Sequence, residues 1–102
     1  PESSASIRER VIKARKIQQE RWKEFGLVCN AELPEKLVKK FLTPGDDEHA
    51  YLVKMAEKFN LSGRGLSRVL KVSRTIADLA GDENIQKKHL AEALMYRQVY
   101  GR

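Results

Sequence analysis

Apolar residues recur every three or four positions along most of this chain, which is the spacing of amphipathic helices. The first such segment follows a possible capping box made by Ser6 and Glu9, runs on from Ile7 and ends at Gly26. Its expected inward side is apolar and contains Ile7, Val11, Ala14 and Trp22. Residues 27–33 form a connector, and the chain enters a short helix over residues 34–42 with Pro34 in its first turn.

Three further helices are predicted after a strong break at Pro44 and Gly45. Asp46 or Asp47 can cap a helix over about 47–59. Its inward residues are expected among Ala50, Tyr51, Val53, Met55, Ala56 and Phe59. A fourth helix extends from an N-cap at Ser62 to a left-handed terminator at Gly81, and a fifth covers residues 86–98. The inward residues of the fifth are Leu90, Ala93, Leu94 and Val99. The pattern predicts an all-α fold, a small bundle of four to five helices in a single domain over residues 1–102.

The fourth predicted helix places an arginine between two glycines in its first turn, within the segment LSGRGLSRVLKVSRTIADLAG. On a helical wheel Arg68, Lys71 and Thr75 fall within ~40° of Arg64, and three of these residues form a basic stripe: Arg64, Arg68 and Lys71. The stripe is expected to face away from the core, with Asp78 closing it and Arg74 on its flank. Free N–H groups at a helix start attract anions, and arginine donates two parallel hydrogen bonds to phosphate. The stripe therefore indicates a phosphate site, and a merely solvated surface is the alternative.

Charge and cysteine content add a class of partner and a compartment. Twenty basic residues outnumber fourteen acidic ones, for a net charge of +6, which suits a nucleic-acid partner or a soluble surface. Basic residues of the first helix are candidate DNA contacts: Arg8, Lys13, Arg15, Lys16 and Arg21. Cys29 is alone, so no internal disulfide is expected, and no apolar run is long enough for a membrane span. A cytoplasmic location follows as the expectation.

The chain lacks the motifs of an enzyme. It has no P-loop sequence, and neither His49 nor His89 has a partner at metal-ligand spacing, so no catalytic residue and no metal site are expected. His89 is predicted to lie at the surface or its boundary. Trp22 could stack on a base, but packing of the first helix is the favoured interpretation.

Two stretches of the chain resemble a known family. The segment NLSGRGLSRVLKVSRTIADLAGDENIQKKHLAEALMYR resembles the C-terminal helical lid of magnesium chelatase-related, ComM-like AAA+ ATPases. That lid has the form L-S-x-R-x-x-x-R-x-L-K-V-x-R-T-I-A-D-L, followed by an acidic-Ile loop and H-L-x-E-A-L-x-Y-R. Upstream, ESSASIRERVIKARKIQQERW resembles the same family's I-R-x-R-V-x-x-A-R-x-x-Q-x-x-R helix, and NAEL its Asn-Ala connector. The chain departs from the pattern at Gly63, Gly65 and Ser73, where alanine is usual.

The resemblance implies a role for the arginine between the glycines. In this family the lid packs over a nucleotide held by a preceding P-loop domain, and Arg64 matches the sensor 2 arginine that reaches the γ-phosphate of ATP. Arg68 matches a second, supporting arginine, and Lys71 and Arg74 match interface or phosphate contacts. The chain is then expected to be the C-terminal fragment of a longer ATPase, without enzyme activity or bound cofactor of its own.

The implied cofactor of the full-length protein is ATP with Mg²⁺. Its implied partners are the protein's own P-loop ATPase domain, the neighbouring subunits of a hexameric ring, and DNA as the substrate of a motor. Two alternatives stay open: a stand-alone basic nucleic-acid-binding module, and the lid of a true magnesium chelatase subunit that drives metal insertion.

Overall fold

The computed structural model describes the backbone of residues 2–100 and the side chains of residues 2–96. All regular elements in this range are helical, which confirms the predicted small helical bundle. Five α-helices and two short 3₁₀ turns follow one another along the chain: α1 (Ser4–Trp22), η1 (Lys23–Phe25), η2 (Asn30–Glu32), α2 (Glu35–Phe41), α3 (Asp46–Lys58), α4 (Gly63–Ala80) and α5 (Lys87–Tyr100).

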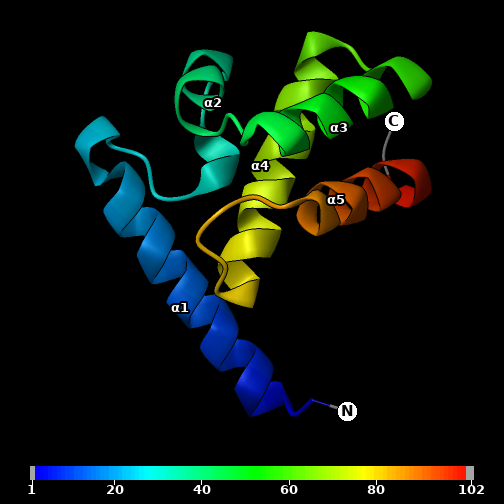
Figure 1. Cartoon of the computed structure of the whole chain (residues 1–102). Helices are drawn as coiled ribbons and strands as arrows, with labels where there is room; N and C mark the ends of the chain where they lie inside the picture. Colours follow the sequence, from blue (N-terminus) through cyan, green and yellow to red (C-terminus); the bar gives the residue numbers. More distant parts are fainter. Residues whose placement is uncertain (1, 101–102) are drawn as a thin grey trace.

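Helix α4 is the centre of the arrangement, with α1 and α2 to one side of it and α3 and α5 to the other (Figure 1). It packs against α1, α2, η2 and α5, so most of the other elements depend on it. The first turns of α1 extend past the remaining helices (Figure 1). Ile7 lies in this extension and keeps 44% of its surface exposed, although it was expected to face inward.

Two apolar clusters flank α4. The larger lies between α3, α4 and α5 and contains Leu52, Val69, Ile85, Leu90, Ala93 and Leu94. The smaller joins the end of α1 to α2 and consists of Trp22, Leu33, Val38 and Leu42. Leu70 of α4 packs against both clusters. Helix α4 therefore has apolar contacts on both sides. Full burial of a leucine side chain, as at Leu90 in the larger cluster, contributes about 1.5–3 kcal/mol.

Helix caps explain where the predicted boundaries were right and where they were wrong. Ser62 caps α4 by accepting a hydrogen bond from the Gly65 N–H at 3.1 Å, and Gly81 ends the helix in the left-handed conformation, as predicted. The expected cap of the first helix was wrong, because Ser3 accepts from the Ser6 N–H and α1 begins earlier. Gly45 is the N-cap of α3, without a side-chain hydrogen bond.

The prediction for the inward face of α3 is confirmed in part, because Tyr51, Met55 and Phe59 pack against the larger cluster. Leu52 is the buried residue of this helix and was not predicted, whereas Ala50 and Val53 are exposed. The helix begins at Asp46, so its three acidic residues lie in the first turn, where the helix dipole favours them. In α5, the prediction for Leu90, Ala93 and Leu94 is confirmed, and Val99 lies outside the described side chains.

Candidate functional site

The first two turns of α4 present two arginines to solvent. Arg64 and Arg68 are both exposed, and neither forms a hydrogen bond or ion pair with any residue that the structure describes. The first turn contains no acidic residue. Two positive side chains therefore lie near the helix end whose dipole disfavours them, and the nearby Glu35 carboxylate, which accepts from Ser67 Oγ at 3.5 Å, forms no ion pair with either arginine.

The glycines on either side of Arg64 are not required by packing. A Cβ at Gly63 would meet only the Glu35 Oε1 at 3.7 Å, and one at Gly65 would meet Ser62 Oγ at 3.5 Å and Leu61 at 3.7 Å. All of these are ordinary contact distances. A methyl group would therefore fit at either glycine, and Gly63 is exposed whereas Gly65 is half-buried.

The second half of the predicted stripe does not face solvent, so the expectation that the whole stripe points away from the core was wrong. The Lys71 Nζ donates to the carbonyls of Leu33 at 3.0 Å and Ala31 at 3.4 Å. Thr75 accepts a hydrogen bond from the side-chain amide of Asn30 at 3.0 Å. The reason is that η2 packs over this side of α4, and polar groups of η2 form hydrogen bonds with Lys71 and Thr75.

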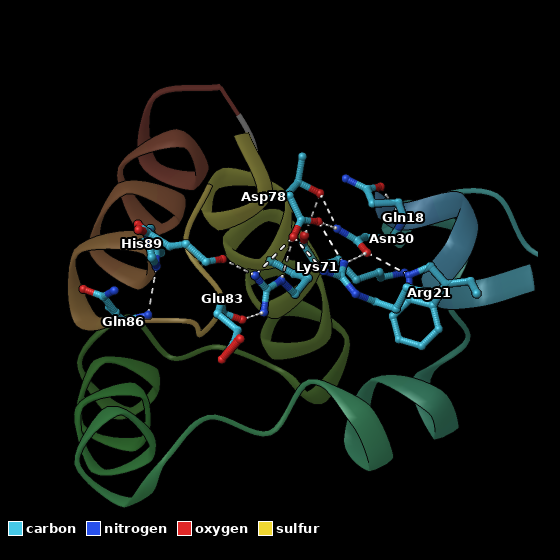
Figure 2. A network of polar contacts seen from close by, with 12 residues as sticks. Gln18, Arg21, Asn30, Lys71, Asp78, Glu83, Gln86 and His89 are labelled. Atoms are coloured by element: carbon cyan, nitrogen blue, oxygen red, sulfur yellow. Dashed lines mark hydrogen bonds and ion pairs between the residues drawn. The ribbon is translucent and has the colours of Figure 1, made fainter. Parts of the chain in front are cut away.

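Asp78, in the last turn of α4, is the centre of a buried polar network (Figure 2). Its side chain is 1% exposed. Arg21 donates two hydrogen bonds to its carboxylate, at 2.8 and 2.9 Å, and Asn30 donates one at 3.0 Å. The Arg74 Nε adds a fourth at 3.2 Å. Because the partners come from α1, η2 and α4, this one carboxylate ties three elements together.

The ionised form of Asp78 is favoured by these partners. Burial alone would raise the pKa of the Asp78 carboxyl, but hydrogen bonds from Arg21 and Asn30 and the charges of Arg21 and Arg74 outweigh it. The pKa of Asp78 therefore lies below its ordinary value. Asp78 is a charged structural group at neutral pH, and the arginines that reach it are bound within the domain.

Asn30 supplies the network with its second buried polar centre (Figure 2). It is fully buried, and its backbone N–H donates to the Gln18 Oε1 at 2.9 Å. Its side-chain oxygen accepts from the indole N–H of Trp22 at 2.8 Å. Trp22 is 2% exposed, so the packing interpretation of this tryptophan is confirmed.

Arg74 extends the network to the loop before α5. Its guanidinium donates to the carbonyls of Asp82 at 2.8 Å and Glu83 at 2.9 Å. Burial lowers the pKa of Arg74 from its ordinary value, and the charges of Asp78 and Asp82 oppose this effect. Arg74 therefore lies inside the domain, where it fastens the loop after α4 to the helix.

His89 is 2% exposed, which makes its predicted surface position wrong. Its Nδ1 accepts from the Gln86 N–H at 2.8 Å, so the ring hydrogen of the neutral imidazole lies on Nε2, which faces the Asp82 carboxylate at 2.8 Å. The side chain thus caps the start of α5 in the way that a capping-box glutamate would. The hydrogen bond from His89 is also the main reason that the pKa of Asp82 is lowered.

The structure separates the candidate DNA contacts of α1 into two kinds. Four of them are exposed along the helix: Arg8, Lys13, Arg15 and Lys16. Arg21 instead belongs to the Asp78 network, and 26% of its side chain is exposed. The sequence carried one hint of this pairing, because Asp78 was the acidic residue on an otherwise basic stripe.

Neither a metal centre nor a membrane-spanning helix is found among the described residues. The described residues contain no group of three or more histidine, cysteine or acidic side chains that could hold a metal ion. Among the same residues, no helix is both long and apolar enough to cross a bilayer.

The chain belongs to the family described as magnesium chelatase, subunit ChlI C-terminal, whose model matches residues 1–97. Among curated proteins it is similar to competence protein ComM of Haemophilus influenzae, with 47% identity over 96 residues, or 94% of this chain and 18% of that protein. It is also 37% identical to protein YifB of Salmonella typhimurium over 98 residues, or 96% of this chain and 19% of that protein. The chain therefore spans about a fifth of the length of these relatives. No solved structure matches it.

Proposed function

We propose that this domain is the lid of a magnesium chelatase-like AAA+ ATPase and that Arg64 contacts the γ-phosphate of ATP bound by a P-loop domain. The observation that carries the proposal is the contrast within α4. Lys71, Arg74 and Asp78 all have partners inside the domain, whereas Arg64 and Arg68 have none among the described residues. Two unpaired arginines at a helix start suit a phosphate group, because the guanidinium and the backbone N–H groups are all donors.

The rigid connection of α4 to the rest of the domain supports a coupling role. The Asp78 network and both apolar clusters hold α1, α2 and α5 against α4, so a force applied at its first turn reaches the whole domain. In the proposed motor, the presence or absence of the γ-phosphate at Arg64 moves the lid as one body, and a ring of subunits transmits the movement to DNA. The Mg²⁺ that accompanies ATP is held outside this chain.

The direct test is ATP hydrolysis by the full-length protein with Arg64→Ala. We expect turnover to fall on the order of 100-fold, because a positioned donor to the developing phosphate charge is lost. Arg64→Lys keeps the charge but not the paired hydrogen bonds, and it should restore turnover only in part. Lys54→Ala is the matched control, since Lys54 is also a basic, exposed residue but lies on α3.

Normal turnover by a folded Arg64→Ala protein would refute the sensor role. Stimulation of the wild-type ATPase by branched DNA would support the DNA motor, and stimulation only by a porphyrin-metallating partner would favour the metal-insertion alternative.

A nucleic-acid-binding module is the second candidate, and the four exposed basic residues of α1 favour it. It predicts that the 102-residue chain binds duplex DNA with a salt slope of about −0.9 for each phosphate contacted. Absence of binding at about 0.1 M salt would count against this candidate, because charges more than about 10 Å apart are largely screened there.

A further inference from the structure

A pair of exposed phenylalanines lies where the end of α1 meets α2. Phe25 is 42% exposed and Phe41 45% exposed, and their ring centroids are 5.5 Å apart. Both rings also contact the buried Trp22, at 6.3 and 5.7 Å between centroids. Since Asn30 holds the indole N–H, Trp22 forms a fixed floor beneath the two rings. We call Trp22, Phe25 and Phe41 the aromatic platform.

Exposed lysines lie close to this platform in the sequence, and one of them lies against the Phe41 ring. Lys23, Lys39 and Lys40 are exposed, and the Lys40 Nζ lies 5.4 Å from the centroid of the Phe41 ring. The salt bridge of Lys23 with Glu20 spans 3.3 Å, and both side chains are more than 70% exposed, so it is too weak to hold Lys23 back from a partner. An exposed apolar surface with a positive border favours a partner that is both flat and anionic.

A groove of about 460 Å³ adjoins the platform at Phe41. Its apolar lining includes Phe41, Pro44 and Ile85, and its polar lining includes Glu48, Asn84 and Gln86. This size lies within the range of small-molecule sites, about 300–1,000 Å³. Side-chain amides donate and accept hydrogen bonds, and Glu48 adds an acceptor, so the groove offers the edge of a planar heterocycle both kinds of partner.

We propose that the aromatic platform and the adjoining groove bind single-stranded nucleic acid. Bases stack on the Phe25 and Phe41 rings, the lysines contact the phosphates, and one base edge reaches Asn84 and Gln86 in the groove. Exposed aromatic rings within a positive surface are the usual means of binding single strands without sequence preference. This proposal does not depend on ATP contact by Arg64, and its test uses no ATP.

The test is fluorescence anisotropy of the 102-residue chain with labelled ten-nucleotide dT and rU strands, at salt concentrations from about 0.05 to 0.2 M. Loss of one stacking ring costs about 1–3 kcal/mol. We therefore expect Phe25→Ala and Phe41→Ala each to weaken binding about 5- to 150-fold. Phe41→Trp should keep the affinity because it keeps an aromatic face. Met95→Ala is the matched control, since Met95 is 63% exposed on α5 and should leave the affinity unchanged.

A second set of variants separates stacking from charge attraction. Lys39→Gln and Lys40→Gln should each reduce the salt slope by about 0.7, the value for one phosphate of a single strand. Asn84→Ala should weaken binding without changing that slope. Equal affinity for dT and rU would show that the site accepts either strand, and a preference would identify the strand that the platform favours. Either result supports the platform if the phenylalanine variants lose affinity.

Three results would overturn the proposal. The first is no binding by the wild-type chain at about 0.05 M salt. The second is loss of affinity in the lysine variants alone, with Phe25→Ala and Phe41→Ala unchanged. The third is binding of an acidic peptide, but not of either strand, that is lost in the phenylalanine variants, which would make the platform a protein interface. Phe25→Leu and Phe41→Leu, checked by helical circular dichroism, distinguish loss of a ring from loss of the fold.

Discussion

A single carboxylate organises the polar interior of this domain. Asp78 has a side chain that is 1% exposed and is reached by Arg21, Asn30 and Arg74. Among the described residues, no buried side-chain nitrogen or oxygen lacks a hydrogen-bond partner. A network satisfied in this way is stable as a whole, but the loss of one member leaves charged or polar groups buried without partners.

The first stability prediction concerns Asp78→Asn. The substitution keeps the shape of the side chain and removes the charge that Arg21 and Arg74 require. Because breaking a buried ion pair leaves an uncompensated charge, the free energy of unfolding should fall by about 3 kcal/mol. Urea denaturation followed by the fluorescence of Trp22 measures this, since Trp22 is the only tryptophan and is buried beside the network. The exposed Glu92→Gln is the control and should change stability by less than about 0.5 kcal/mol.

At the scale of the element, α4 combines two different ends. Its first two turns carry two exposed arginines and two glycines, whereas its last turns carry buried residues and the Asp78 network. Gly81 ends the helix at φ 76°, a conformation that side-chain-bearing residues rarely adopt. Gly65 thus lies within a regular helical turn, whereas Gly81 has a left-handed backbone at the end of the same helix.

The same substitution at these two positions should have opposite effects. Gly65→Ala places a methyl group at ordinary contact distance inside a helix, so it should raise the free energy of unfolding by about 0.5–1 kcal/mol. Gly81→Ala should lower it by about 1 kcal/mol, because the left-handed backbone is strained with a Cβ even though no atom lies within 4 Å. Thermal unfolding of both variants checks this. A destabilised Gly65→Ala protein would show that Ser62 and Leu61 do not accommodate the added methyl group.

Local signals predicted much of the fold and little of the network. The cap at Ser62, the terminator at Gly81 and the helical class follow from residues within one or two turns of each other. The burial of Asn30 and Asp78 depends on a pair separated by 48 residues, which no periodicity reports. The position of His89 was predicted wrongly for a different reason: its partner Asp82 is only seven residues away, but the course of the loop between them is held by Arg74.

At the scale of the whole molecule, α1 has fewer apolar contacts to the domain than a helix of its length could make. Its buried residues are Ala14, Gln18 and Trp22, and two of these three serve the polar network or contact it. The attachment of α1 to α4 therefore depends on charge and hydrogen bonds as well as on burial. The stability of this attachment should therefore depend on pH where Asp78 titrates, whereas the stability contributed by the apolar clusters should not.

The last prediction is the direction of that response. The pKa of Asp78 is lower in the folded domain than the value of about 3.9 for an unfolded chain. The unfolded state therefore binds the proton first, and the stability contributed by Asp78 is complete above about pH 5 and is lost as the pH falls through the folded-state pKa.

Urea denaturation at a series of pH values from about 7 to 3 should show this loss as a fall in the free energy of unfolding. Other carboxylates also titrate in this range, so the comparison with Asp78→Asn is decisive. The difference in unfolding free energy between wild type and Asp78→Asn should be constant above about pH 5 and should shrink below pH 4, because a protonated aspartic acid is as neutral as asparagine. A difference that stays constant down to pH 3 would show that the charge of Asp78 does not hold α1 against α4.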